Sequence, residues 1–151
     1  MIDKRFVGLD LGSHEVQLEK GALKFFATAI GQENSVYFDE KAAAEAGYPG
    51  LPVPPSYYFS LDMFQDEPFG YFDTLGVDLN HVLHGAQDFE YFKPAFAGET
   101  VVLKAKIVDL FDKKNGALDF IIKEVRVENK AGDLLAKQVM TIIVRNPEGR
   151  A

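Results

Sequence analysis

The second half of the chain alternates apolar and polar residues with the period of two that is typical of β-strands. Leu103, Ala105 and Ile107 alternate with two lysines. Val125 and Val127 alternate with charged residues in the same way. This pattern buries one face of a strand and leaves the other in water, as in an antiparallel sheet. Four runs rich in β-branched and aromatic residues therefore predict four strands: AQDFEYF (86–92), VVLKAKIVDLF (101–111), LDFIIKEVRVEN (118–129) and LLAKQVMTIIVRN (134–146).

The segments between these runs carry turn residues. AGET, KKNGA and NKAGD separate the runs, and Asn115–Gly116 is a strong signal for a β-hairpin. Most of the runs are longer than the roughly 5–6 residues of an average strand. Long strands joined by tight turns predict a curved sheet that wraps around another element.

The first half of the chain has helical spacing instead. A short strand is expected at 14–18, and GALKFFATAIG (21–31) places Leu23, Phe26 and Ile30 on one helical face. A second helix is expected in EKAAAEA (40–46), because Asp39 can cap its start and Gly47 can end it.

A proline-rich segment and an aromatic run follow these helices. Four prolines between residues 49 and 55 force an extended backbone. The run SYYFSLDMFQ (56–65) then favours a buried helix with Ser56 as its N-cap, with a strand as the second choice. This helix would fill the curved sheet, so the expected fold class is α+β, in one domain over residues 1–151.

Composition narrows the choice of partners. The net charge of −7 argues against nucleic acid, which needs clustered Lys and Arg, and an anionic ligand would require a local basic patch. Aromatic residues make up 13% of the chain, which favours a thick core or an apolar cavity. The chain has no cysteine, no run long enough to span a membrane and no apolar signal segment in Met1–Gly12. A cytoplasmic domain without a membrane partner is expected.

Two stretches together resemble a known family. They are ALKFFATAIGQENSVYFDEKAAAEAGYPGLPVPPSYYFSL (22–61) and LHGAQDFEYFKPAFAGETV (83–101). The order of helix, polar turn, capped helix, proline segment and HGxQ…P…G(E/D) resembles the N-terminal domain of MaoC-type dehydratases, over roughly residues 5–145. The resemblance implies a hotdog fold, in which a curved antiparallel sheet wraps a long central helix. It also implies an (R)-specific enoyl-thioester hydratase or 3-hydroxyacyl dehydratase, with no cofactor and no metal.

The catalytic motif of that family is altered in this chain. MaoC-like hydratases carry GDxNPxHxD, in which the Asp and the His are the acid and base. Gln32 stands at the position of the Asp, Asn34 at that of the Asn, Tyr37 at that of the His and Asp39 at that of the last Asp. Gln32 cannot titrate, and Tyr37 is a poor general base unless its surroundings perturb it strongly.

This departure is shared by the N-terminal, substrate-supporting halves of the family. Their catalytic pair comes from a second hotdog, on the same chain or on a partner. The resemblance therefore implies that this chain binds an acyl-CoA or acyl-carrier-protein thioester and pairs as a homodimer or heterodimer with a hotdog subunit that carries the motif.

The candidate substrate-binding residues come from three places: the altered motif, the aromatic run at 56–65, and the residues at and just before the start of the predicted strand at 86–92. Tyr37 and His84 are also the candidates for catalysis, but each has a structural alternative, in packing or at an interface. On a flat strand His84 and Gln87 would face opposite sides, whereas a bulge at Gly85 would bring them together. The full set is Gln32, Asn34, Tyr37, Tyr57, Tyr58, His84 and Gln87.

Two other functions stay open on the sequence alone. A homodimeric hotdog thioesterase would need an acid near the central helix, for which Glu33 and Asp62 are the candidates. A non-catalytic acyl-thioester binding module would need none. Lys93, Lys104 and Lys106 are surface lysines that could contact phosphopantetheine or CoA.

Overall fold

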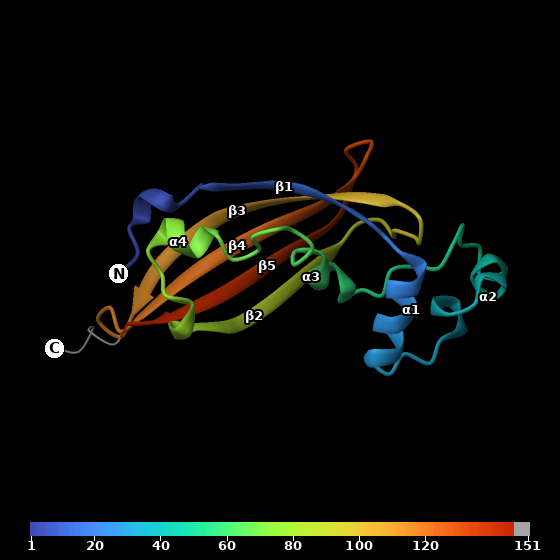
Figure 1. The fold of residues 1–151 in the computed structure, drawn as a ribbon, viewed down its shortest axis with the longest axis horizontal. Coiled ribbons are helices and arrows are strands. Elements are labelled where there is room, and N and C mark those ends of the chain that lie inside the picture. The colour runs from blue at the N-terminus through green and yellow to red at the C-terminus, as the bar shows by residue number, and fades with distance from the viewer. Residues whose placement is uncertain (147–151) are drawn as a thin grey trace.

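A computed structural model of the chain describes residues 1–146. Its main element is a curved five-stranded sheet in the order β1-β3-β4-β5-β2, in which every neighbouring pair is antiparallel (Figure 1). The edges of the sheet are β1 and β2. The strands are β1 (Asp10–Gln17), β2 (Val82–Tyr91), β3 (Thr100–Lys113), β4 (Leu118–Asn129) and β5 (Leu134–Arg145).

The strand predictions from the period of two are confirmed. All four predicted runs are strands, and the short strand expected at 14–18 is β1, which begins four residues earlier. Lys114, Asn115 and Gly116 all have positive φ angles, of 54°, 53° and 79°. This left-handed turn joins β3 to β4 as the Asn-Gly signal predicts.

The two predicted helices of the first half are present as α1 (Lys20–Ala29) and α2 (Glu40–Glu45), which lie together at one end of the sheet (Figure 1). Asp39 caps α2 by accepting a hydrogen bond from the Lys41 N–H at 2.9 Å. Gly47 ends it with a φ of 85°, and the Tyr48 N–H returns to the Ala43 carbonyl. Within residues 1–146, the helices are all too short or too polar to cross a lipid bilayer.

The central helix is shorter than the sequence predicts. The helix expected over 56–65 is the single turn α3 (Tyr57–Leu61), and a second turn, α4 (Tyr71–Leu75), follows after a loop. The expectation is wrong beyond Leu61, where the N–H groups of Met63 and Phe64 bond to carbonyls three residues back and tighten the chain. The segment from α3 to α4 covers the inner face of the sheet (Figure 1). Three 3₁₀ turns complete the structure: η1 (Lys4–Phe6), η2 (Ser35–Tyr37) and η3 (Leu79–His81).

The inner face of the sheet is apolar at both ends and polar in the middle. One buried cluster joins α1 and α3 to residues such as Val101 and Val125. A second joins α4 to residues such as Ile121 and Ile142. Four polar side chains lie between the clusters and are called here the polar band: Asp62, Gln87, Lys123 and Gln138.

The polar band is built by strand alternation. Lys123 lies between Ile121 and Val125 on the inner face of β4, and it is 2% exposed. Gln138 lies in the same way between Ala136 and Met140 on β5. The alternation predicts which β4 positions point inward, and Lys123 occupies one of them in phase with buried valines.

Candidate functional site

The loop after α1 is held in place by its own polar side chains. Gln32 Oε1 accepts hydrogen bonds from the N–H groups of Glu33 at 3.0 Å and Asn34 at 3.1 Å. Asn34 Oδ1 accepts one from the Val36 N–H at 3.2 Å, and Asp39 caps α2. These oxygens shape the backbone of the loop. No titratable acid–base pair stands at the motif positions of this loop.

Tyr37, at the position of the motif His, lines a pocket of about 310 Å³ that we call the tyrosine pocket. It brings together two of the predicted binding residues, Tyr37 and Tyr58, with Lys93 at its rim. Burial, helped by the negative charges of Glu99 and Tyr91, raises the pKa of Tyr58 to about 12. Tyr58 is therefore a neutral hydroxyl near neutral pH. The pocket is lined by Tyr37, Tyr48, Pro52, Val53, Pro55, Tyr58, Tyr91, Phe92, Lys93 and Pro94.

The proline segment forms one wall of this pocket. The Val53 N–H bonds to the Ala95 carbonyl at 2.9 Å, which holds the segment beside the chain that follows β2. The Tyr57 N–H bonds to the Pro54 carbonyl at 2.9 Å. Pro54 and Pro55 have no N–H at all. This segment therefore offers few backbone donors to a thioester oxygen.

Tyr57 lies apart from the tyrosine pocket. Its ring is buried in the core and meets Phe26 edge-on, with ring centres 5.0 Å apart. Burial raises the pKa of Tyr57. Tyr57 and Tyr58 both belong to the buried core, but only Tyr58 also lines the tyrosine pocket.

The bulge expected at Gly85 is present. The register of β2 against β5 shifts between His84 and Ala86, so that His84 pairs with Ile142 and Gln87 with Met140. Both partners are buried on the inner face, and His84 and Gln87 therefore share that face. Gln87 Nε2 donates to Gln138 Oε1 at 3.2 Å, whereas His84 packs edge-on against Phe59 with ring centres 5.3 Å apart.

His84 lines a second pocket, of about 320 Å³, which we call the central pocket. His84 and Tyr91 are seven positions apart on β2, so roughly 20 Å separates them at the rise of a strand. Tyr37 and His84 therefore lie at different pockets and do not meet at one reacting centre. The central pocket is lined by Phe59, Asp62, Met63, Phe69, Tyr71, Phe72, Leu79, Val82, Leu83, His84, Lys123, Met140 and Ile142.

A buried ion pair stands in the wall of the central pocket. Lys123 Nζ donates to Asp62 Oδ2 at 2.6 Å, and both side chains are 2% exposed. The ammonium group also lies 4.7 Å from the centre of the Tyr71 ring. Burial, and then the charge of Asp62, raises the pKa of Tyr71. Lys123 is absent from the residues that the sequence predicts for the site, although a lysine in phase with Val125 and Val127 is a visible signal.

The other titratable candidates are distributed as follows. Of the two acids considered for a thioesterase, Glu33 is exposed in the loop after α1 and Asp62 lies in the central pocket. Lys104 and Lys106 lie on the exposed face of β3 and pair with Glu128 and Glu124. Neither lysine lines the tyrosine pocket or the central pocket.

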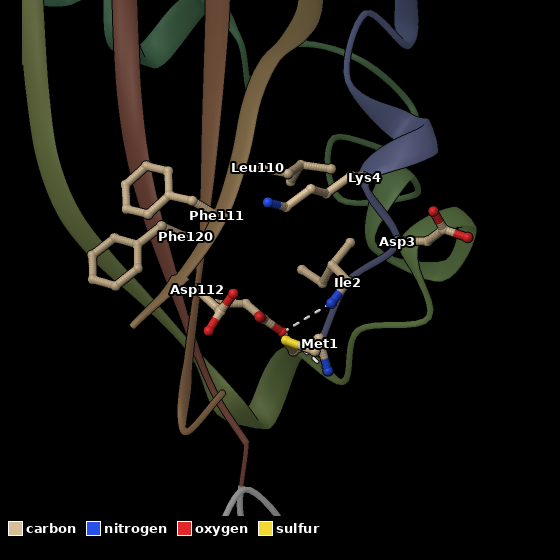
Figure 2. A pocket seen from close by; sticks show the side chains of 9 residues that line it. Met1, Ile2, Asp3, Lys4, Leu110, Phe111, Asp112 and Phe120 are labelled. Atoms are coloured by element: carbon tan, nitrogen blue, oxygen red, sulfur yellow. Dashed lines mark hydrogen bonds and ion pairs between the residues drawn. The ribbon is translucent and has the colours of Figure 1, made fainter. Parts of the chain in front are cut away.

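A third hollow, of about 440 Å³, lies where Met1–Lys4 run beside β3 and β4 (Figure 2). Its acid Asp119 is already engaged. Asp119 Oδ2 accepts hydrogen bonds from the Ile2 N–H at 3.0 Å and from Asn146 Nδ2 at 2.8 Å. The bond from Ile2 holds the N-terminal residues against the sheet.

Comparison with solved structures defines the class of the protein. The HadBC (3R-hydroxyacyl-ACP dehydratase) complex of Mycobacterium tuberculosis matches with a TM-score of 0.78 and 21% identity, over 91% of this chain and 96% of that chain. The ChsH1–ChsH2 complex of the same organism matches with a TM-score of 0.75 and 22% identity, over 94% of this chain and 92% of that chain. A MaoC-like dehydratase matches with 0.81 and 19%, over 95% of this chain and 43% of that longer chain. The fold is the hotdog fold of the MaoC-like dehydratases.

Sequence relatives place the chain within a family. Residues 5–138 match the family described as FAS1-like, dehydratase domain region, and the chain belongs to this family. A UPF0336 protein of Streptomyces avermitilis is 29% identical over 150 residues, which cover 97% of each chain. A UPF0336 protein of Tropheryma whipplei is 32% identical over 122 residues, which cover 80% of this chain and 84% of the relative. The resemblance to MaoC-type dehydratases is thereby confirmed.

Proposed function

We propose that this chain is the acyl-binding subunit of an (R)-specific enoyl-thioester hydratase or 3-hydroxyacyl-thioester dehydratase. The observation that carries the proposal is the loop at 31–39. It aligns in sequence with the family's catalytic loop, but Gln32 and Asn34 hold its turn and Tyr37 lines a pocket. In this proposal the catalytic Asp and His come from a partner hotdog.

The tyrosine pocket supports the binding of a thioester. Its wall is mostly rings and prolines, which suit an acyl or pantetheine chain. Tyr58 supplies a neutral hydroxyl. Lys93, at the exposed rim, pairs with Asp133 at 3.1 Å, and its ammonium group keeps further donors that can meet a phosphate of CoA or of an acyl-carrier protein. The remaining candidates, Gln32 and Asn34, act by shaping the loop beside the pocket.

The exposed edge strand β2 supports the proposal that a partner subunit pairs with this sheet. β2 has ten residues, and Leu83, Tyr91 and the adjoining Phe92 are 41%, 49% and 48% exposed. An exposed edge of this length with apolar side chains is a site for pairing with another sheet. The exposed side chains of the other edge, β1, are all polar. Two of the structural neighbours, HadBC and ChsH1–ChsH2, are themselves complexes.

The direct test is a hydration assay with crotonyl-CoA. The purified chain alone is expected to add no water across the double bond. Co-purified with a hotdog subunit that carries GDxNPxH, it is expected to give a complex whose activity exceeds that of the partner alone. Replacing the partner's motif Asp with Asn should abolish this activity.

Variants of the tyrosine pocket separate binding from chemistry. Tyr37→Phe and Tyr58→Phe in the complex are expected to raise KM for the thioester about tenfold or less, as for the loss of one hydrogen bond. Glu33→Gln, an exposed change on the same loop, serves as the control. Rapid hydration by the isolated chain, lost on changing its own His84 or Tyr37, would refute the proposal.

A further inference from the structure

The central pocket has an unusual polar wall. Asp62 Oδ1 and Gln87 Oε1 are buried atoms without a hydrogen-bond partner among residues 1–146. Both belong to the polar band that divides the two core clusters, but of the two only Asp62 lines the central pocket. Both are acceptors, so what this region lacks is a donor.

Leaving such an acceptor unpaired is costly. A buried polar group without a partner destabilises a fold by about 1–3 kcal/mol, and a charged group by more. The Asp62 carboxylate uses Oδ2 for Lys123 and keeps Oδ1 free. The Lys123 ammonium has three donors, one of which goes to Asp62 and another of which faces the Tyr71 ring. Asp62 and Lys123 both line the pocket, and their side chains, each 2% exposed, place a free acceptor and a spare donor together beside it.

Apart from Tyr71 and His84, the rest of the wall is apolar. Phe59, Phe72 and Ile142 are typical of its lining, and the volume of about 320 Å³ is at the lower end of ligand pockets. A ligand of this site must bury hydrocarbon and also satisfy one acceptor and one donor at a single point. A hydroxyl group does both, because it donates one hydrogen bond and accepts others.

We propose that the central pocket binds a small aliphatic or alicyclic alcohol, whose hydroxyl donates to Asp62 Oδ1 and accepts from Lys123 Nζ. An ether or a ketone accepts only and leaves Asp62 Oδ1 unpaired. A carboxylate brings a second negative charge against Asp62. This pocket is separate from the tyrosine pocket, and the proposal stands whether or not the chain binds a thioester.

The methionines provide a probe of binding that needs no activity. The chain has three, of which Met63 and Met140 line the central pocket and Met1 lies in the N-terminal hollow. With ¹³C-labelled methionine methyl groups, titration with n-octanol is expected to shift the signals of Met63 and Met140 and to leave that of Met1 in place. Heptyl methyl ether, an isomer of octanol without a donor, is the matched ligand.

Two variants test the role of the ion pair. Asp62→Leu combined with Lys123→Met removes both charges, and Asp62→Asn keeps the shape but replaces one acceptor by a donor. The ratio of octanol affinity to ether affinity is compared between proteins, so that the different solubilities of the ligands cancel. Glu128→Gln is the control, because Glu128 is also a buried acid paired with a lysine but does not line the pocket.

The expected result is a tenfold to hundredfold fall of this ratio, on the scale of about 1.5–3 kcal/mol for a hydrogen bond to a charged group, in both Asp62 variants. The ratio should be unchanged in the Glu128 variant. The proposal is overturned if the ratio of octanol affinity to ether affinity is the same in wild type and in both variants. It is also overturned if octanol shifts only the Met1 signal, or if the wild-type chain shows no saturable octanol binding.

Discussion

At the residue scale, the Lys123–Asp62 pair is the feature with the largest energetic consequence. Taking two charges out of water costs several kcal/mol per ion, and only a close pair with good geometry offsets that cost. The 2.6 Å contact between Lys123 Nζ and Asp62 Oδ2 meets this condition. The Tyr71 ring adds a cation–π contact with the ammonium group. Each charge is stable in the core only because the other is present.

Breaking this pair is expected to destabilise the fold strongly. Lys123→Met leaves Asp62 as an unpaired buried carboxylate, and the free energy of unfolding should fall by about 3–5 kcal/mol. Adding Asp62→Leu should restore most of that loss, because no buried charge remains. Urea denaturation followed by circular dichroism measures both changes. A loss below about 1 kcal/mol, as for an exposed ion pair, would show that water reaches Asp62.

Glu128 is expected to make stability depend on pH in the acid range. A hydrogen bond from Lys104, and a further one from Arg126, hold the pKa of Glu128 below its ordinary value of 4.5. A carboxyl whose pKa is lowered by folding stabilises the protein fully above its ordinary pKa. That stabilisation is lost as the pH falls through the lowered value.

Denaturation of wild type and Glu128→Gln across a pH series measures this contribution. The stability difference between the two proteins should be constant from pH 7 to about 5 and shrink below the ordinary pKa of 4.5. Glu33→Gln, which removes an exposed carboxylate, is the control. A difference that grows on acidification would contradict the assignment.

At the scale of elements, the sequence predicts best where a local rule decides the structure. The period of two identifies the strands, and Asp39 and Gly47 delimit α2 at the ends where they cap it. The length of the central helix is decided by tertiary contacts instead. Asp62 follows α3 and reaches across to Lys123, 61 positions later, and no local pattern encodes that partner.

A bulge and a surface ion pair account for two further features that the alternation does not show. Glu128 lies on the wet face of β4, as the alternation predicts, but it is only 7% exposed beside its partners Lys104 and Arg126. The bulge at Gly85 was proposed from the glycine alone, yet only the pairing with β5 shows that His84 and Gln87 share the inner face. The distance between Tyr37 and His84 depends on the whole sheet. For this reason the sequence could not show that they serve two pockets.

The Gly85 bulge is expected to tolerate no side chain. A Cβ at Gly85 would lie 2.9 Å from Ile143 Cδ1 and 3.0 Å from the Thr141 backbone oxygen, which cannot move aside easily. Gly85→Ala should therefore lower the free energy of unfolding by about 1–3 kcal/mol. Gly21→Ala, in α1, meets no atom within 4 Å and should stabilise the protein by about 0.5–1 kcal/mol. Thermal unfolding compares the two, and equal effects would contradict the steric explanation.

At the scale of the whole molecule, the two edges of the sheet differ. β2 exposes the apolar side chains of Leu83 and Tyr91 beside the charged Asp88 and Glu90, whereas the exposed side chains of β1 are all polar. A charged side chain at an edge opposes pairing with another strand. The difference between the edges therefore predicts which one takes part in association.

A lysine on β2 is expected to weaken association with a second copy or with a motif-bearing hotdog. Ala86→Lys, at an exposed position of β2, should raise the dissociation constant several-fold, since one cross-strand pair contributes about 0.2–1 kcal/mol. Ser13→Lys, at an exposed position of β1, is the matched control and should have no effect. Analytical ultracentrifugation measures both. A stronger effect at Ser13 would assign the interface to β1.

The division of the core by four polar side chains also bears on how the molecule opens. Apolar contacts bind the residues of each cluster to one another, and the polar band interrupts them between α3 and α4. Regions with separate cores can open separately. Backbone amides should accordingly exchange with deuterium in two groups along β4 and β5, with different opening energies and a boundary near Lys123.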